Sequence, residues 1–179
     1  MRVEIGNALI ELHQGDITDE TTDAIVNAAN SQLAGGGGVD GAIHRRGGHA
    51  IMAETDARYP EGCPTGSAVI SSAGNLPVRY VVHAVGPVWS GGNRGEAELL
   101  AAAYRRCLEL AVEHNCQSIA FPSLSTGAYR YPIDRAARIA LQTVIRFLQE
   151  QEAPSRVRFV LFDEGAYGAY AAALEELAP

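Results

Sequence analysis

The chain has 179 residues, 47% of them hydrophobic, and a formal net charge of −7, because 21 acidic residues outnumber 14 basic ones. That length fits one ordinary domain, and an acidic balance without a basic tract argues against a surface that tracks nucleic-acid phosphates. All 14 basic residues are arginine, which excludes a Schiff-base lysine, a P-loop lysine and an amine general base. A site for phosphates must therefore use backbone amides or arginine.

Other features of the composition indicate where the protein works. No apolar run approaches the roughly 20 residues that span a membrane, and the N-terminus lacks the order of a secretory signal. Cys63, Cys107 and Cys116 form no CxxC pair and leave an odd count, which disfavours a disulfide framework. We expect a soluble cytoplasmic protein, one domain over residues 1–179, and a monomer.

Short apolar runs alternate with helical patterns along the chain. Val3–Ile5 and Leu9–Leu12 flank Gly6-Asn7 and indicate a hairpin. Continuous apolarity, typical of a sheet covered on both faces, predicts five further strands over 24–28, 68–71, 80–85, 118–121 and 157–162. Apolar residues at helical spacing predict helices over 96–115, 133–149 and 170–177. These elements predict an α/β fold, a three-layer α/β/α sandwich around a central mixed sheet.

Two loops are candidates for anion binding. Gly35–Gly41 follows the strand over 24–28, and Ser125–Tyr129 follows the strand over 118–121; each precedes a helical pattern. Ligands of open α/β sheets bind at the carboxyl ends of strands, where helix N-termini favour anions. Two such loops can hold a diphosphate without lysine. Neither matches GxGxxG or the P-loop, and a flexible spacer is the alternative for the glycine run.

Several segments together carry a family resemblance, in the family's order and at its spacing: Gly15–Thr18, Ile25–Asn30, Gly35–His44, His83–Pro87 and Phe121–Gly127. In this combination the chain resembles the macrodomains and, more narrowly, their MacroD-type class, over nearly its whole length. The resemblance implies the macrodomain fold and ADP-ribose binding. For this class it also implies hydrolysis of ADP-ribosyl esters: mono-ADP-ribose on Asp or Glu side chains of proteins, and O-acetyl-ADP-ribose.

The resemblance also implies a place for the adenine. Asp16 would accept a hydrogen bond from the adenine amino group beside the Ile17 amide, and Phe162 would lie against the adenine ring. The alternatives are a strand-end turn for Asp16 and core packing for Phe162.

The diphosphate and the distal ribose are assigned in the same way. The implied phosphate loops are Gly37, Gly38 and Val39, next to Asp40, and then Ser125, Thr126, Gly127 and Ala128. Tyr129 would line the distal ribose and Asn30 would hydrogen-bond it. For Asn27 we expect bonding to the backbone.

Asp40 and Asn30 are the implied catalytic residues. We expect Asp40 to orient or deprotonate a water that attacks the ester, with a substrate phosphate as an alternative base. Asp40 also fits the N-cap of a helix. His44, four residues on, either orients Asp40 or is a packed, hydrogen-bonded histidine. His83 lies in an apolar strand and is expected in the core.

No metal or cofactor is expected beside the ligand, because His13, His49 and His114 show no ligand spacing with one another or with cysteine. Two arginines depart from the family pattern, and they leave the substrate preference open. Arg46 stands where alanine is usual, and Arg130 stands where glycine is common; exposure to solvent is the alternative role for Arg130.

The implied partners are ADP-ribose and its esters and mono-ADP-ribosylated proteins, with no membrane and with nucleic acid only as ADP-ribosylated ends. The main alternative function is a module that reads ADP-ribose without turning it over. A dinucleotide oxidoreductase is more remote, since the Rossmann glycine fingerprint is absent.

Overall fold

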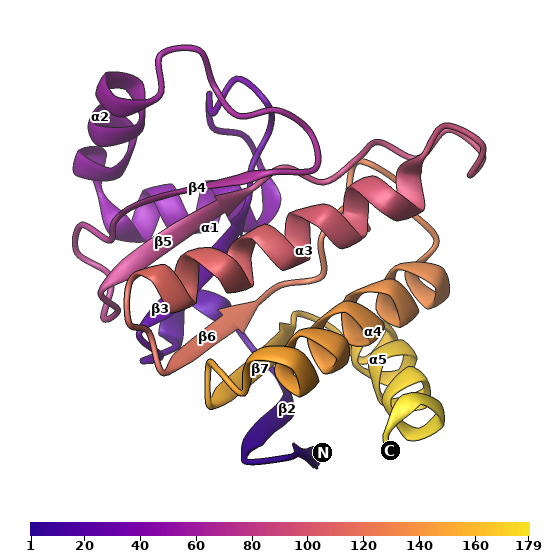
Figure 1. Cartoon of the computed structure of the whole chain (residues 1–179). Helices are drawn as coiled ribbons and strands as arrows, with labels where there is room; N and C mark the ends of the chain where they lie inside the picture. The colour runs from indigo at the N-terminus through magenta and orange to yellow at the C-terminus, as the bar shows by residue number, and fades with distance from the viewer.

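The computed structural model describes all 179 residues and contains one seven-stranded sheet in the order β1-β2-β7-β6-β3-β5-β4 (Figure 1). The strands are β1 (Arg2–Ile5), β2 (Ala8–Gln14), β3 (Ala24–Ala28), β4 (Ala68–Ser72), β5 (Tyr80–Ala84), β6 (Ser118–Phe121) and β7 (Arg156–Leu161). The outer pairs β1–β2 and β4–β5 are antiparallel, and the pairs between them are parallel. The predicted mixed sheet is therefore confirmed.

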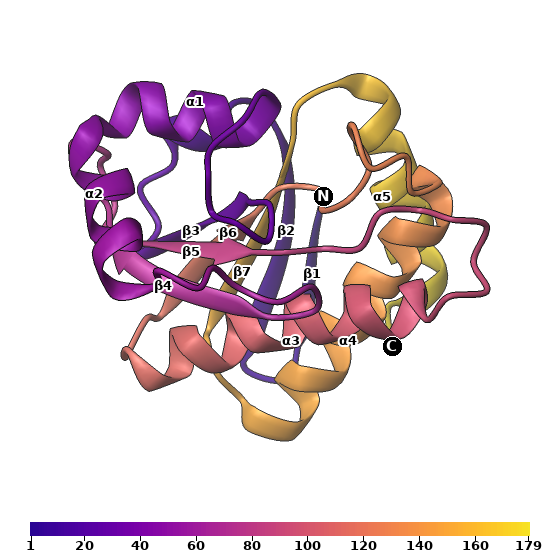
Figure 2. The same cartoon turned by 90° about the horizontal axis from the view of Figure 1, so that it is seen from above.

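Helices cover both faces of this sheet. They are α1 (Gly38–Gly47), α2 (His49–Arg58), α3 (Glu96–Glu113), α4 (Ile133–Gln151) and α5 (Glu164–Leu177), with a short 3₁₀ turn, η1 (Ile17–Asp19). Figure 2 shows α1 and α2 on one side of the strands, and α3 and α4 on the other with α5 beside α4. These are the three layers expected from the sequence. No helix combines the length and the apolarity that crossing a membrane requires.

The alternation of side chains along each strand builds a separate core on each face. Ile25 and Val81 pack with Ile43 of α1 and Ile51 of α2. The neighbouring strand residues turn to the other face, where a larger cluster under α3, α4 and α5 includes Val26, Val82, Phe121, Phe159 and Leu141. Apolar burial on both faces explains why the strand sequences are continuously apolar.

The hairpin is confirmed, since β1 and β2 pair antiparallel around Gly6, whose φ is +60°. Two helices differ from expectation. No pattern predicts α2, because Ile51 and Thr55 are its only buried residues, too few for a helical period. α5 starts six residues before its predicted start, since Asp163 caps it by accepting a hydrogen bond from the Ala166 N–H at 2.8 Å.

Candidate functional site

The carboxyl ends of the parallel strands bring the two predicted loops to one edge of the sheet. β3 and β6 are neighbours, yet β3 leads through α1 and α2 toward β4 and β5, whereas β6 leads through α4 to β7. The connections therefore diverge between these two strands, which is where open α/β sheets hold ligands. The ends of β2 and β7 bring Asp16 and Phe162 to the same edge.

At the β2 and β7 ends, Asp16 and Phe162 are both exposed. Asp16 Oδ1 accepts hydrogen bonds from Thr18 Oγ1 at 2.7 Å and from Thr18 N at 2.9 Å, and these bonds lower the pKa of Asp16. Phe162 is 81% exposed, so core packing is the wrong interpretation of that residue. Ile17 follows Asp16 as the first residue of η1, and its side chain is buried.

Arg46 ties this end of the site to α1. Its guanidinium donates to Thr18 Oγ1 at 3.1 Å and to the Asp19 carboxylate. Arg46 therefore holds η1, which carries Ile17 and follows Asp16, against the last turn of α1. Arg130, by contrast, is exposed and forms no salt bridge, in keeping with the solvent alternative.

Asn30 fixes the first loop. Its Nδ2 donates to Gly35 O at 2.9 Å, and its Oδ1 accepts from Ala34 N at 3.0 Å. Gly38 has a φ of +57°, which favours glycine, and a Cβ on it would meet nothing within 4 Å. Gly37 has a φ of −89° and also faces open space, so nothing within the protein requires glycine there. Its small size leaves room for a close-lying ligand.

Asp40 lies in the first turn of α1 and is only 6% exposed. The expectation that Asp40 is the N-cap is wrong: Gly37 occupies that position, and no side chain caps the helix. The Asp40 carboxylate turns inward instead. Its Oδ1 accepts from Asn27 Nδ2 at 2.7 Å and lies 3.2 Å from His44 Nε2. The contact between His44 and Asp40 therefore favours the alternative in which His44 orients Asp40.

A buried chain of polar side chains continues from Asp40 into the sheet. Asn27 on β3 and His83 on β5 are register partners, and Asn27 Nδ2 lies 3.2 Å from His83 Nδ1. Ser71 on β4 lies diagonal to His83, with its Oγ 2.8 Å from His83 Nε2. Burial, and then the nearby His44, lower the pKa of His83 to about 4, so its ring is neutral at pH 7.

The contacts of these buried polar side chains differ from two expectations. Asn27 was expected to bond to the backbone, but its amide bonds to the side chains of Asp40 and His83. His83 lies in the core as expected, yet it is bonded at both ring nitrogens. Ser71 was not singled out from the sequence, because its contact depends on the register of an antiparallel pair.

The second loop is held by its backbone. Ser125 O accepts from Tyr131 N at 2.9 Å, and Tyr129 O accepts from Trp89 N at 2.8 Å. Ser125 has a φ of +67°, and its buried Oγ has no partner within the protein. Thr126 donates to Ser123 Oγ at 2.8 Å, while Gly127 and Ala128 are exposed. α4 begins at Ile133, as the sequence predicts, so Ser125–Tyr129 precede the helix and lie outside its first turn.

Glu96 anchors the segment that follows β5, and the sequence analysis missed it. Its carboxylate accepts from the backbone N–H groups of Ser90 and Gly92 at 2.9 Å and of Arg94 at 2.6 Å. Burial opposes ionisation, but these bonds outweigh it and lower the pKa of Glu96 to about 2. A Glu placed directly after a glycine-rich turn is the signal that points to such a role.

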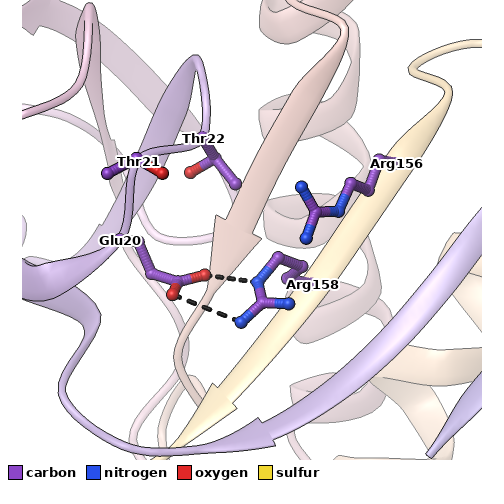
Figure 3. A pocket seen from close by; sticks show the side chains of 5 residues that line it. All are labelled: Glu20, Thr21, Thr22, Arg156 and Arg158. Atoms are coloured by element: carbon purple, nitrogen blue, oxygen red, sulfur yellow. Dashed lines mark hydrogen bonds and ion pairs between the residues drawn. The ribbon is translucent and has the colours of Figure 1, made fainter.

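A polar hollow of about 130 Å³ lies at the amino ends of β3 and β7, the edge opposite the two loops (Figure 3). Arg158 forms a two-pronged ion pair with Glu20 there, and Arg156 pairs with Glu11. The arginines are thus already neutralised by carboxylates. Throughout the chain, no three His, Cys, Asp or Glu side chains are grouped so as to hold a metal ion.

Comparisons with known proteins agree with this geometry. The Macro domain family model matches residues 26–140, and the chain belongs to the macrodomain family. It is 57% identical over 170 residues to a macro domain-containing protein of Caldanaerobacter subterraneus subsp. tengcongensis, which covers 94% of this chain and 97% of that protein. Among solved structures, the Oceanobacillus iheyensis macrodomain with ADP superposes with a TM-score of 0.94 at 47% identity, covering 99% of this chain and 95% of the other. The Trypanosoma brucei macrodomain in complex with ADP-ribose superposes with a TM-score of 0.86 at 41% identity. This match covers 92% of this chain and 68% of the other.

Proposed function

We propose that this protein binds ADP-ribose at the edge formed by its two loops and hydrolyses ADP-ribosyl esters, on Asp or Glu side chains of proteins and in O-acetyl-ADP-ribose. The observation that carries the proposal is the buried Asp40 carboxylate, held by Asn27 and His44 in the first turn of α1 directly after the glycine loop. The whole chain acts in this proposal as one domain.

Binding is supported from both ends of the site. Exposed Phe162 and Asp16 offer an aromatic face and an acceptor for adenine. The backbone N–H groups of Gly38 to Asp40 open α1 and have no intrahelical acceptor, so they suit a phosphate. Ser125 to Ala128 supply the opposite loop, and Tyr129 the wall of the distal ribose. Relatives in this family are solved with ADP and, for a G37V mutant, with ADP-ribose.

In the proposed reaction Asp40 orients a water and takes one of its protons. The water oxygen forms a bond to the ester carbonyl carbon as the bond from that carbon to the ADP-ribose oxygen breaks, and Asp40 returns its proton to the leaving oxygen. A phosphate of the substrate is the alternative base. Asn30, which holds the first loop through Gly35 and Ala34, keeps the distal ribose next to Asp40.

A reader that only binds ADP-ribose is the competing function. A reader needs the loops but gains nothing from a desolvated carboxylate, which costs free energy unless hydrogen bonds compensate it. Asp40 is not required as a helix cap, because Gly37 occupies that position. The buried acid therefore favours the enzyme.

The test is release of ADP-ribose from a protein mono-ADP-ribosylated on glutamate. Asp40→Ala should lower kcat by about 10²–10⁴ while ADP-ribose still binds in calorimetry. Asp134→Ala is the matched control, since Asp134 also lies in the first turn of a helix but is exposed. Binding without release by the wild type would make the protein a reader, and full activity of Asp40→Ala would remove Asp40 from the mechanism.

A further inference from the structure

The direction of each hydrogen bond among the buried polar side chains follows from Ser71, at one end of the series. The Ser71 hydroxyl has one hydrogen and donates it to Ser72 O at 2.9 Å. The 2.8 Å contact between Ser71 Oγ and His83 Nε2 therefore needs the hydrogen of Nε2. A neutral imidazole with Nε2–H presents a bare Nδ1. Asn27 Nδ2 donates to that nitrogen at 3.2 Å and gives its other hydrogen to Asp40.

The opposite tautomer would disrupt the contact with Asp40. A hydrogen on His83 Nδ1 would point at the Asn27 amino group, so two donors would face each other. Asn27 would relieve this by turning its amide over, which places its oxygen where Nδ2 now meets Asp40 Oδ1. The carboxylate would then meet an acceptor in place of a donor, an unfavourable contact in a buried site.

We propose that His83, held as its Nε2–H tautomer by Ser71, is a positioning residue that fixes the Asn27 amide as the donor to Asp40. Its consequence for turnover rests on the hydrolase proposed above. His83 touches neither loop; it acts through Asn27, its register partner across β3 and β5. Together, β4, β5 and β3 support the carboxylate on α1.

The tautomer can be measured without any substrate. In ¹⁵N-labelled protein at pH 7, NMR should find His83 in the Nε2–H form. Ser71→Ala removes the acceptor and should produce a population with Nδ1–H, together with a shifted Asn27 side-chain amide. An Nδ1–H ring in the wild type, or an unchanged His83 and Asn27 in Ser71→Ala, would overturn the proposal.

Turnover provides the second measurement. His83→Leu removes the acceptor that fixes the Asn27 amide. The hydrogen bond from Asn27 to the charged Asp40 should then be lost, which should lower kcat by roughly 10- to 100-fold. KM and the Kd for ADP-ribose should stay within about twofold, because the binding loops are untouched. His83→Asn places an oxygen near the former Nδ1 and should restore most of kcat.

The controls separate positioning from loss of structure. His114→Leu is the matched histidine variant, since His114 ends α3 at the opposite edge of the sheet, and its kcat should not change. A His83→Asn variant as slow as His83→Leu, or an unimpaired His83→Leu, contradicts a positioning role. If His83→Leu fails to fold, Ser71→Ala is assayed for kcat in its place. If the wild type releases no ADP-ribose, the proposed function fails. The NMR measurement still tests whether Ser71 holds His83 as its Nε2–H tautomer.

Discussion

Gly86 and Ser125 lie so close together that a Cβ atom on Gly86 would be 2.2 Å from Ser125 Oγ. Gly86 follows β5, and Ser125 belongs to the second loop, after β6. No larger residue fits between the two unless the Ser125 hydroxyl turns away or the loop that carries it moves. The glycine is required here by a close approach and not by its own backbone conformation, since its φ is not positive.

Gly86→Ala should therefore displace the Ser125 hydroxyl and, with it, disturb the second loop. Overpacking of this kind costs about 1–3 kcal/mol of the free energy of unfolding, which urea denaturation measures. If the loop holds a phosphate, the affinity for ADP-ribose should fall by about tenfold, equivalent to about 1.4 kcal/mol in calorimetry.

Ser125→Gly should relieve much of that damage. Ser125 has a φ of +67°, which a non-glycine residue adopts at a cost, and glycine removes the hydroxyl that collides. In a double-mutant cycle the coupling between the two substitutions should reach about 0.5–3 kcal/mol. Additive effects of Gly86→Ala and Ser125→Gly would show that the contact does not limit the loop.

Phe162→Ala separates binding from stability. Because Phe162 is 81% exposed, its removal should change the free energy of unfolding by no more than about 0.5 kcal/mol. Loss of stacking on adenine should weaken ADP-ribose binding by about 1–3 kcal/mol. Calorimetry with ribose 5-phosphate, which lacks adenine, is the control and should show no change. Equal losses for both ligands would place the adenine elsewhere.

The sequence predicts the strands well because their apolarity is local information. The strand ends at 28 and 121 are followed by the two loops, and the parallel order of β3 and β6 then brings the loops together. The fold class and the edge that carries the site follow from those patterns. α2 escapes prediction, since its two buried residues leave no helical period to detect.

The contacts inside the site could not be predicted in the same way. Asn27 meets His83 because β3 and β5 are in register, and Ser71 meets His83 because of the register of β4 with β5. Register is a property of the assembled sheet and leaves no local pattern. The N-cap expectation for Asp40 failed because the glycines before it let α1 start three residues earlier, with Gly37 as the N-cap.

Arg46→Ala tests the link between α1 and η1. Its ion pair with Asp19 is largely exposed, so the free energy of unfolding should fall by less than about 1 kcal/mol. Since the same side chain holds Thr18, and Thr18 holds Asp16, we expect a few-fold loss of affinity for ADP-ribose in calorimetry. Arg45→Ala is the control, because Arg45 is exposed and forms no salt bridge. Equal effects of the two substitutions would mean that general charge, and not the link, matters.

The last prediction concerns acid stability. Histidine in an unfolded chain takes up its proton near pH 6.5, whereas burial and the neighbouring His44 lower the pKa of His83 to about 4. Between these values the unfolded chain binds more protons than the folded protein does. The free energy of unfolding should therefore decrease as the pH falls from about 6.5 to about 4, by up to about 3 kcal/mol from His83 alone. Urea denaturation of the wild type and of His83→Asn, between pH 7.5 and the onset of carboxylate protonation near about 4.5, isolates this contribution. The two curves should converge as the pH falls, because only the wild type has this buried histidine to protonate. Parallel curves would mean that the pKa of His83 is the same in the folded protein as in the unfolded chain.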